Sequence, residues 1–204
     1  MACNYRRVFL CGVHSVGKTT LLRQLSLTLD TESFLPPGMP VRYESEVARS
    51  VLVEMGLQKR DLNPQTRPDT FEELQNQILL KQRAVEERNN RSGSCFCFLD
   101  RGIDPLVYAR FYLGEEAYRR LLAKPHAQEN VALCRDESSL VFVISPKPEC
   151  IEHDGTRITP VLKEMNDFTD VMIRTLDELE IRFVLIDVLD LTERVKIVEH
   201  AIRS

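Results

Sequence analysis

An eight-residue stretch near the start of the chain has the residue types and spacing of a phosphate-binding loop. It follows the apolar run 8–11, precedes the helix-like residues 21–25, and reads Gly12-Val13-His14-Ser15-Val16-Gly17-Lys18-Thr19. A strand, a glycine-permitted turn and a helix in this order roll successive backbone N–H groups toward one point, where the helix N-terminus also favours negative charge. The stretch therefore predicts a binding site for a nucleoside triphosphate.

Each constrained position of this loop has a physical role. Gly12 lets the chain leave the strand, and Gly17 lets the backbone approach phosphate oxygens closely. We expect Lys18 to reach the β- and γ-phosphates and the Thr19 hydroxyl to bind Mg²⁺, which keeps several of its waters in such sites. Thr20 continues the helix and completes the expected nucleotide-binding segment.

An apolar run that ends in an acid and a base is the second chemical feature. Asp100, Arg101 and Gly102 follow directly after residues 96–99. Ligands of open α/β sheets bind outside the carboxyl ends of the strands, so Asp100 would lie beside the phosphate loop if its strand neighbours the first one. It would then hold Mg²⁺ through water, or orient or deprotonate a substrate hydroxyl, while Arg101 would pair with a phosphate or the substrate. A helix-capping acid and a surface ion pair are the structural alternatives.

A third cluster, residues 44–49, follows a short predicted strand and opens a helix. Acidic residues in a first helical turn are explained by the helix dipole alone. If the strand order brings this end of the sheet to the same cleft, Glu46 becomes a candidate general base or a ligand of an Mg²⁺-bound water. Arg49 lies one helical turn further on and shares its face, as a candidate substrate contact.

The segment after Gly102 predicts another helix. Asp104 comes directly before Pro105, and this pair is typical of an N-cap followed by the first helical residue. On that helix, Tyr108 and Phe111 are the two aromatic residues that we consider for stacking against a substrate. Aromatic residues at helical spacing more often belong to the core.

Strand and helix signals alternate along the chain, which predicts a parallel sheet covered on both faces. The expected strands lie near residues 7–11, 40–43, 95–99, 140–144 and 182–186. The expected helices lie near residues 18–29, 44–55, 70–89, 105–111, 115–122, 160–179 and 192–202. Prolines at 146 and 148 end the fourth strand, and Asp154-Gly155 marks a turn, so residues 145–159 are a candidate lid. Arg157 on this lid would offset charge during phosphoryl transfer, although a lone loop arginine is more often solvated.

Length and composition predict one ordinary globular domain over residues 1–204. The chain has 43% hydrophobic and 28% charged residues, a formal net charge of −4 and a pI near 5.7. This balance does not favour nucleic-acid binding by charge, and residues 119–124 hold the only local basic group that hints at it. We expect a cytoplasmic protein, because no signal-peptide core or membrane-spanning run is present and the cysteines lack metal-binding spacing.

Taken in order, four motifs resemble a known group of proteins. They are the phosphate loop, residues 46–49, residues 100–104 with Tyr108, and residues 154–157. Over about residues 7–202 the chain resembles the AAA-type ATPase domain of the nicotinamide-nucleotide regulator and TRP-degradation-type proteins. That group is similar in turn to small P-loop kinases of nucleosides and nucleotides.

The resemblance implies a P-loop NTPase fold, a three-layer α/β sandwich whose five-stranded parallel sheet has the order 2-3-1-4-5, with helices on both faces. It also implies ATP or GTP with Mg²⁺. In the kinase relatives an acid after the second strand acts on the substrate hydroxyl, and Glu46 matches it. The acid-arginine pair after the third strand matches Asp100 and Arg101, and the arginine-bearing lid matches residues 147–157.

We therefore expect a kinase that transfers the γ-phosphoryl group of ATP to a hydroxyl of a small, plausibly nucleoside-like acceptor. The guanine-reading Asn/Thr-Lys-x-Asp pattern is absent from the sequence, which favours ATP over GTP. One alternative is a nucleotide-binding regulator or slow NTPase that acts through a protein partner. Another is a nucleic-acid end kinase. A kinase needs an enclosed acceptor pocket between Glu46 and the helices near 70–89 and 105–111, whereas a regulator needs only switch loops.

Overall fold

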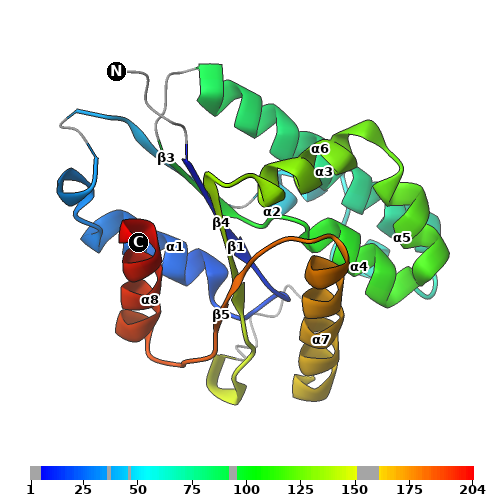
Figure 1. The fold of residues 1–204 in the computed structure, drawn as a ribbon. Coiled ribbons are helices and arrows are strands. Elements are labelled where there is room, and N and C mark those ends of the chain that lie inside the picture. The colour runs from blue at the N-terminus through cyan, green and yellow to red at the C-terminus, as the bar shows by residue number, and fades with distance from the viewer. Residues whose placement is uncertain (1–5, 36–37, 46, 92–95, 151–160) are drawn as a thin grey trace.

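Five parallel strands form the centre of the protein (Figure 1). The computed structural model describes residues 6–35, 38–45, 47–91, 96–150 and 161–204. The strands are β1 (Arg6–Cys11), β2 (Val41–Glu44), β3 (Phe96–Asp100), β4 (Ser139–Ile144) and β5 (Val184–Ile186). Every neighbouring pair is parallel, and the order is β2-β3-β1-β4-β5. The predicted sheet and its strand order are confirmed.

Eight helices of the described chain pack around this sheet. They are α1 (Lys18–Thr28), α2 (Val47–Glu54), α3 (Pro68–Arg91), α4 (Asp104–Leu113), α5 (Glu115–Leu122), α6 (Pro125–Arg135), α7 (Leu162–Glu178) and α8 (Leu191–Arg203). Helices α1 and α8 cover one face, and α3, α4, α6 and α7 lie on the other (Figure 1). Because both faces are covered, β3 is buried throughout, and β1 and β4 are apolar and buried over their last four residues.

Two elements differ from the sequence-based expectation. Helix α6 is not among the expected helices, although Pro125 directly after the extended Lys124 is a typical helix start. Glu44, expected to open a helix, instead ends β2 opposite Leu99, and its carboxylate pairs with Arg88 at 2.7 Å. Pairing with β3 extends the strand to Glu44, so the helical residues of α2 begin at Val47.

The strand register brings the chemically important residues to one edge of the sheet. Leu10 on β1 lies opposite Asp100 on β3, so the phosphate loop starts beside the acid that ends β3. The end of β2 lies on the other side of β3. A small apolar cluster of Val47, Val51, Leu74 and Ile78 joins α2 to α3 next to this edge. Three segments that are far apart in the sequence thus surround one point at the carboxyl end of the sheet.

Crossing a bilayer requires a helix that is both long and apolar, and none of the helices within the described ranges meets both conditions.

Candidate active site

The phosphate loop has the backbone shape that its glycines predict. Gly12 and Gly17 have φ angles of 144° and 89°, which L-residues rarely adopt, and a Cβ on Gly12 would lie 3.0 Å from the carbonyl oxygen of Ile144. Ser15, with a φ of 64°, also turns through the left-handed region. The buried side chain of Val16 anchors the loop in the core. Helix α1 begins immediately afterwards, so its N-terminus faces the cradle.

Lys18 is folded back onto this loop. Its Nζ donates hydrogen bonds to the carbonyl oxygens of Gly12 at 2.6 Å and Val13 at 2.8 Å, and the residue is 5% exposed. Burial lowers the pKa of Lys18, and the positive charge of Arg101 lowers it further. A phosphate oxygen bound in the cradle would give this ammonium group an anionic partner, so the geometry suits the expected contact with β- and γ-phosphates.

Thr19 and Asp100 meet across the sheet edge. The Thr19 hydroxyl donates to Asp100 Oδ2 at 3.0 Å, while Oδ1 of the same carboxylate is buried without a hydrogen-bond partner in the described part of the chain. Within those residues, no group of three or more His, Cys, Asp or Glu side chains could hold a metal ion by itself. A hydroxyl and one carboxylate with a vacant oxygen fit Mg²⁺, which takes few protein ligands and completes its shell with waters and phosphates.

Arg101 follows this acid in a strained conformation. Its φ of 107° is uncommon for a residue with a side chain, and its N–H donates to the carbonyl oxygen of Leu10 at 3.0 Å. The partly buried guanidinium lies 5.8 Å from the ring centroid of Tyr108. This backbone turn aims a permanent positive charge at the space between the phosphate loop and α4.

The prediction that Asp104 caps α4 is wrong. Ile103 occupies the N-cap position, and no side chain caps the helix there. The Asp104 carboxylate is 0% exposed and points inward, where Oδ1 accepts from the Gly12 N–H at 3.0 Å and Oδ2 from the Gly102 N–H at 2.9 Å. Both N–H groups belong to turns that leave the sheet and have no strand partner, so the carboxylate satisfies them. Asp104 therefore fastens the start of the phosphate loop to the turn after β3.

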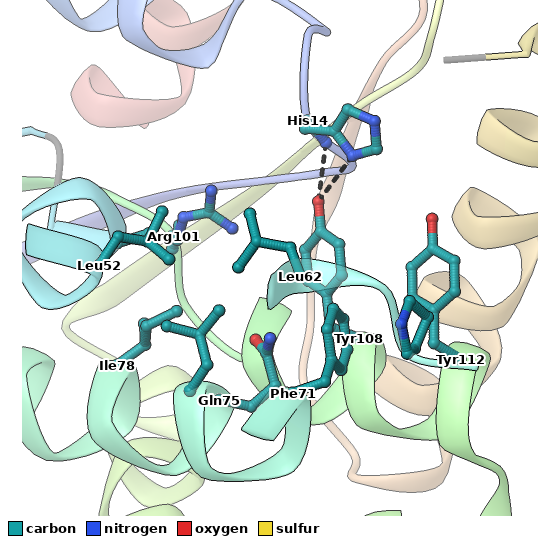
Figure 2. Close-up of a pocket in the computed structure, with 12 residues that line it drawn as sticks. His14, Leu52, Leu62, Phe71, Gln75, Ile78, Arg101, Tyr108 and Tyr112 are labelled. Carbon is teal, nitrogen blue, oxygen red and sulfur yellow. Dashed lines mark hydrogen bonds between the residues drawn. The ribbon is translucent and has the colours of Figure 1, made fainter. Parts of the chain in front are cut away.

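A cavity of about 140 Å³ opens next to the phosphate loop (Figure 2). Its wall comes from α2, residues 62–64, α3 and α4, and is closed toward the loop by His14 and Arg101. The lining residues are His14, Ala48, Leu52, Leu62, Pro64, Phe71, Leu74, Gln75, Ile78, Arg101, Tyr108 and Tyr112. The cavity lies beside the helices between which an acceptor pocket was expected, while Glu46, the third boundary of that pocket, lies outside the described residues. Its surface is mainly apolar and aromatic.

Tyr108 joins the cavity to the phosphate loop. Its hydroxyl accepts a hydrogen bond from the backbone N–H of His14 at 2.9 Å and lies 3.2 Å from Nδ1 of the same residue (Figure 2). The ring stacks with that of Tyr112 at a centroid distance of 6.0 Å and contacts Phe168 at 4.6 Å. Burial raises the pKa of Tyr108, so its phenol stays protonated and available as a donor at neutral pH.

Other predicted site residues are not brought into this cavity. Phe111 packs edge-on against Tyr112 and Phe168, at centroid distances of 4.8 Å and 5.5 Å, and does not line the cavity. Arg49 is exposed on α2 and is also absent from the lining, and Thr20 is exposed on α1. Glu46 and Arg157 lie outside the described residues.

Most of the candidate lid, residues 145–159, also lies outside the described ranges. Its first residues form a short 3₁₀ turn at Pro148–Cys150, and Lys147 donates to the carboxylate of Asp187 at 2.8 Å. Lys147 is thereby tied to the segment after β5. Closure of this segment over a nucleotide stays a prediction.

The sequence reasoning missed Arg194, a buried residue of α8. It is 2% exposed, and its guanidinium donates to the carbonyl oxygens of Val16 and Val188, each at 2.8 Å. A Cβ on Gly17 would lie 3.1 Å from Nη1 of this side chain. An arginine near the start of an amphipathic helix usually indicates a solvated face, so the sequence held no signal for it. Arg194 supports the phosphate loop from behind and connects it to the segment after β5.

Comparisons with known proteins identify the family and the fold of the chain. A family model described as an AAA domain matches residues 7–194, whereas no curated protein matches the chain. The NadR protein in complex with NR has a similar structure, with a TM-score of 0.67 and 21% identity over 96% of this chain and 50% of that one. This chain therefore spans about half the length of that protein.

Two solved kinases share the fold at lower identity. Thymidylate kinase from Candida albicans gives a TM-score of 0.57 and 13% identity over 98% of this chain and 91% of that one. Shikimate kinase from Acinetobacter baumannii, in complex with shikimate, gives a TM-score of 0.54 and 12% identity over 98% of this chain and 94% of that one. The chain belongs to the AAA domain family and is a P-loop NTPase related in fold to small nucleotide and nucleoside kinases.

Proposed function

We propose that this protein is an Mg²⁺-dependent kinase that transfers the γ-phosphoryl group of ATP to a hydroxyl of a small, nucleoside-like molecule. The observation that carries the proposal is the cavity beside the phosphate loop. His14, which belongs to that loop, lines the cavity together with Arg101. A kinase must hold its acceptor within reach of the γ-phosphate and away from water, and a cavity in this position meets that need.

The residues of the site would have distinct roles in such a transfer. Lys18 and the loop backbone would bind the phosphates, and Arg101 would offset negative charge between nucleotide and acceptor. Thr19 and Asp100 would hold Mg²⁺, which neutralises charge on the phosphate oxygens when it is bound. Glu46 is the proposed general base that accepts the proton of the acceptor hydroxyl.

The lid arginine completes this division of roles. Arg157, on the candidate lid 145–159, would add a second positive charge beside that of Arg101 and offset the negative charge that develops during phosphoryl transfer.

Proteins of the same fold support a small-molecule acceptor. The structure of NadR contains NR, and that of the Acinetobacter baumannii shikimate kinase contains shikimate. A nucleic-acid acceptor is less favoured here, because Arg119 and Arg120 pair with Glu115 and Glu72 at 3.1 Å and 2.7 Å and do not form an uncompensated basic groove.

Product analysis tests the proposal. The protein would be incubated with Mg-ATP or Mg-GTP and a pooled library of nucleosides, vitamins and short RNAs with 5′-hydroxyl ends, and products identified by mass spectrometry. We expect a phosphorylated small molecule that forms with ATP and disappears in Lys18→Ala. Phosphorylated RNA would show instead that the protein is a nucleic-acid end kinase. Nucleotide hydrolysis with no phosphorylated acceptor would favour a regulatory NTPase that acts through a protein partner.

A further inference from the structure

Gln75 is a buried polar side chain in the apolar wall of the cavity. It lies on α3, is 4% exposed, and points into the cavity between Ile78 and Phe71 (Figure 2). Two other amides on the same helix donate hydrogen bonds. Asn76 donates to Glu73 at 3.2 Å, and Gln82 donates to the carbonyl oxygen of Gly102 at 3.2 Å, although Oε1 of Gln82 is buried without a partner among the described residues. The amide of Gln75 makes no hydrogen bond to any of the described residues.

The Gln75 amide is not among the polar atoms that are sealed from solvent without a partner, so it keeps contact with solvent while the cavity is empty. A ligand that fills the cavity would remove this water, and the amide would then lose free energy unless the ligand supplied hydrogen bonds in its place. The residues around it on α3 are apolar, with Phe71, Leu74 and Ile78 in the same cavity wall. A leucine or methionine would pack there without this cost. The position of the amide is therefore explained by a ligand that supplies its hydrogen-bond partners when the cavity is filled.

The shape of the cavity restricts that ligand. Its volume of about 140 Å³ is close to the roughly 150 Å³ that holds one benzene ring in an engineered protein cavity. The rings of Phe71 and Tyr112 meet edge to face at 5.6 Å, and those of Tyr108 and Tyr112 stack at 6.0 Å. These aromatic surfaces favour a flat ring, and the volume favours one ring over two fused rings.

Charge restricts the ligand further. Arg101 is the only permanently charged residue among those described in the lining, and its guanidinium points toward the cavity (Figure 2). A cationic ring would be repelled by this charge, whereas a neutral ring with carbonyl oxygens would not.

We propose that Gln75 selects an acceptor whose base is a neutral, single heteroaromatic ring with a hydrogen-bond donor next to an acceptor on its edge. The Gln75 amide presents an N–H donor and a carbonyl acceptor side by side, so it matches a lactam or an aminopyrimidine edge with one bond in each direction. The inference rests on the proposed kinase function, because it places the base of the acceptor in this cavity. The ribose hydroxyl would then lie at the open end, next to His14 and Arg101.

Kinetics with four matched acceptors test this role. The probes are uridine, the 1-phenyl riboside that lacks a polar edge, adenosine with two fused rings, and the cationic riboside of pyridine-3-carboxamide. A site that hydrogen-bonds its substrate rejects analogues without those groups strongly, so we expect kcat/KM for uridine to exceed that for the phenyl riboside by at least about 100-fold. Adenosine and the cationic riboside should also be poorer substrates than uridine.

Gln75→Leu should remove most of this preference. We expect kcat/KM for uridine to fall about 100-fold, while the value for the phenyl riboside changes by less than about threefold. Gln77→Leu is the matched control, because Gln77 carries the same amide on the same helix but bonds to Glu73 and does not line the cavity. Equal melting temperatures of the two variants would show that Gln75→Leu is folded.

Several outcomes would overturn the inference. Equal turnover of uridine and the phenyl riboside by the unaltered protein would remove the role of the ring edge, and a preference for adenosine or for the cationic riboside would refute the size or charge argument. Calorimetric binding of uridine separates this inference from the kinase proposal. If uridine binds only when Gln75 is present but no product forms, the kinase function is contradicted and recognition of the base by Gln75 is supported. If Gln75→Leu phosphorylates uridine as fast as the unaltered protein, the kinase function is supported and recognition of the base by Gln75 is refuted.

Discussion

The hydroxyl of Tyr108 accepts a hydrogen bond from the backbone N–H of His14 at 2.9 Å. Helix α4 is thereby attached to the middle of the phosphate loop, and the same tyrosine ring forms part of the cavity wall. The loop and the proposed acceptor site therefore share one rigid side chain, which is 8% exposed and held by the ring of Phe168. In the proposed kinase, this contact would fix the position of the nucleotide relative to the acceptor.

Replacing this hydroxyl should slow transfer while leaving the fold intact. Tyr108→Phe retains the ring but leaves the His14 N–H without its partner, and a hydrogen bond of this kind contributes about 1 kcal/mol. We expect kcat to fall about fivefold, with a smaller change in the KM for ATP. Tyr118→Phe, which removes the hydroxyl of a buried tyrosine on α5, is the control. An unchanged kcat in Tyr108→Phe would show that the contact does not position the loop.

Replacing Asp104 should lower the free energy of unfolding more than its position at the start of a helix suggests. In Asp104→Asn one of the two N–H groups, of Gly12 or Gly102, would face an NH₂ donor instead of an acceptor. Burying an unpaired donor costs about 1–3 kcal/mol, which for a chain of this size lowers the melting temperature by roughly 2–4 °C per kcal/mol.

Thermal unfolding measures this effect. Asp136→Asn is the comparison, because Asp136 is an exposed acid that also accepts a backbone N–H, from Ser138 at 2.9 Å. A loss of stability in Asp104→Asn no larger than in Asp136→Asn would contradict the assignment of Asp104 as the fastening between the loop and the turn after β3.

Magnesium dependence should follow from the pair Thr19 and Asp100. Chelation of Mg²⁺ should abolish turnover, and Thr19→Ala and Asp100→Asn should each raise the Mg²⁺ concentration needed for half-maximal rate by about tenfold or more. Because both side chains serve one ion, their effects should not add in the double variant. Titration of activity with Mg²⁺ at fixed ATP provides the measurement. Additive effects, or half-maximal concentrations equal to that of the unaltered protein, would place the ion elsewhere.

The parts of the fold that the sequence predicted are those with local causes. The phosphate loop rests on glycine positions that few other residues tolerate, such as Gly12 with its φ of 144°. The central strands are uninterrupted apolar runs, which identify strands buried on both faces. The order of the strands came from a resemblance to known proteins, because strand pairing is a long-range property that no single segment encodes.

The parts that the sequence did not predict depend on where a side chain points. Asp104 was expected to cap a helix, but its carboxylate points inward and accepts the N–H groups of the distant Gly12 and of the nearby Gly102. Arg194 has the local setting of a surface residue and is buried only because α8 packs behind the phosphate loop. Gln75 occupies an apolar helix face, and its unpartnered amide becomes visible only when the cavity is assembled.

The proposed general base gives a test that separates binding from chemistry. Glu46→Gln keeps the size of the side chain but cannot accept a proton at neutral pH, so ATP binding should be unchanged and phosphorylation of the acceptor should fall by about 10²–10⁴-fold. Calorimetry gives the first quantity and product formation the second. If transfer continues at the original rate, the base is another group, and Asp100 with its vacant oxygen Oδ1 is the next candidate.

Arg194 should control how tightly the loop holds a nucleotide. Its hydrogen bonds to the carbonyl oxygens of Val16 and Val188 hold these two segments together. Arg194→Lys retains the charge but reaches one of these carbonyls at a time, so it should raise the KM for ATP by about tenfold and change kcat less. Arg203→Lys on the exposed end of α8 provides the control for the helix itself. A purely structural arginine would instead lower the melting temperature of Arg194→Lys while the KM of the folded protein stayed constant. A raised KM with an unchanged melting temperature would therefore identify Arg194 as a positioning residue of the phosphate loop.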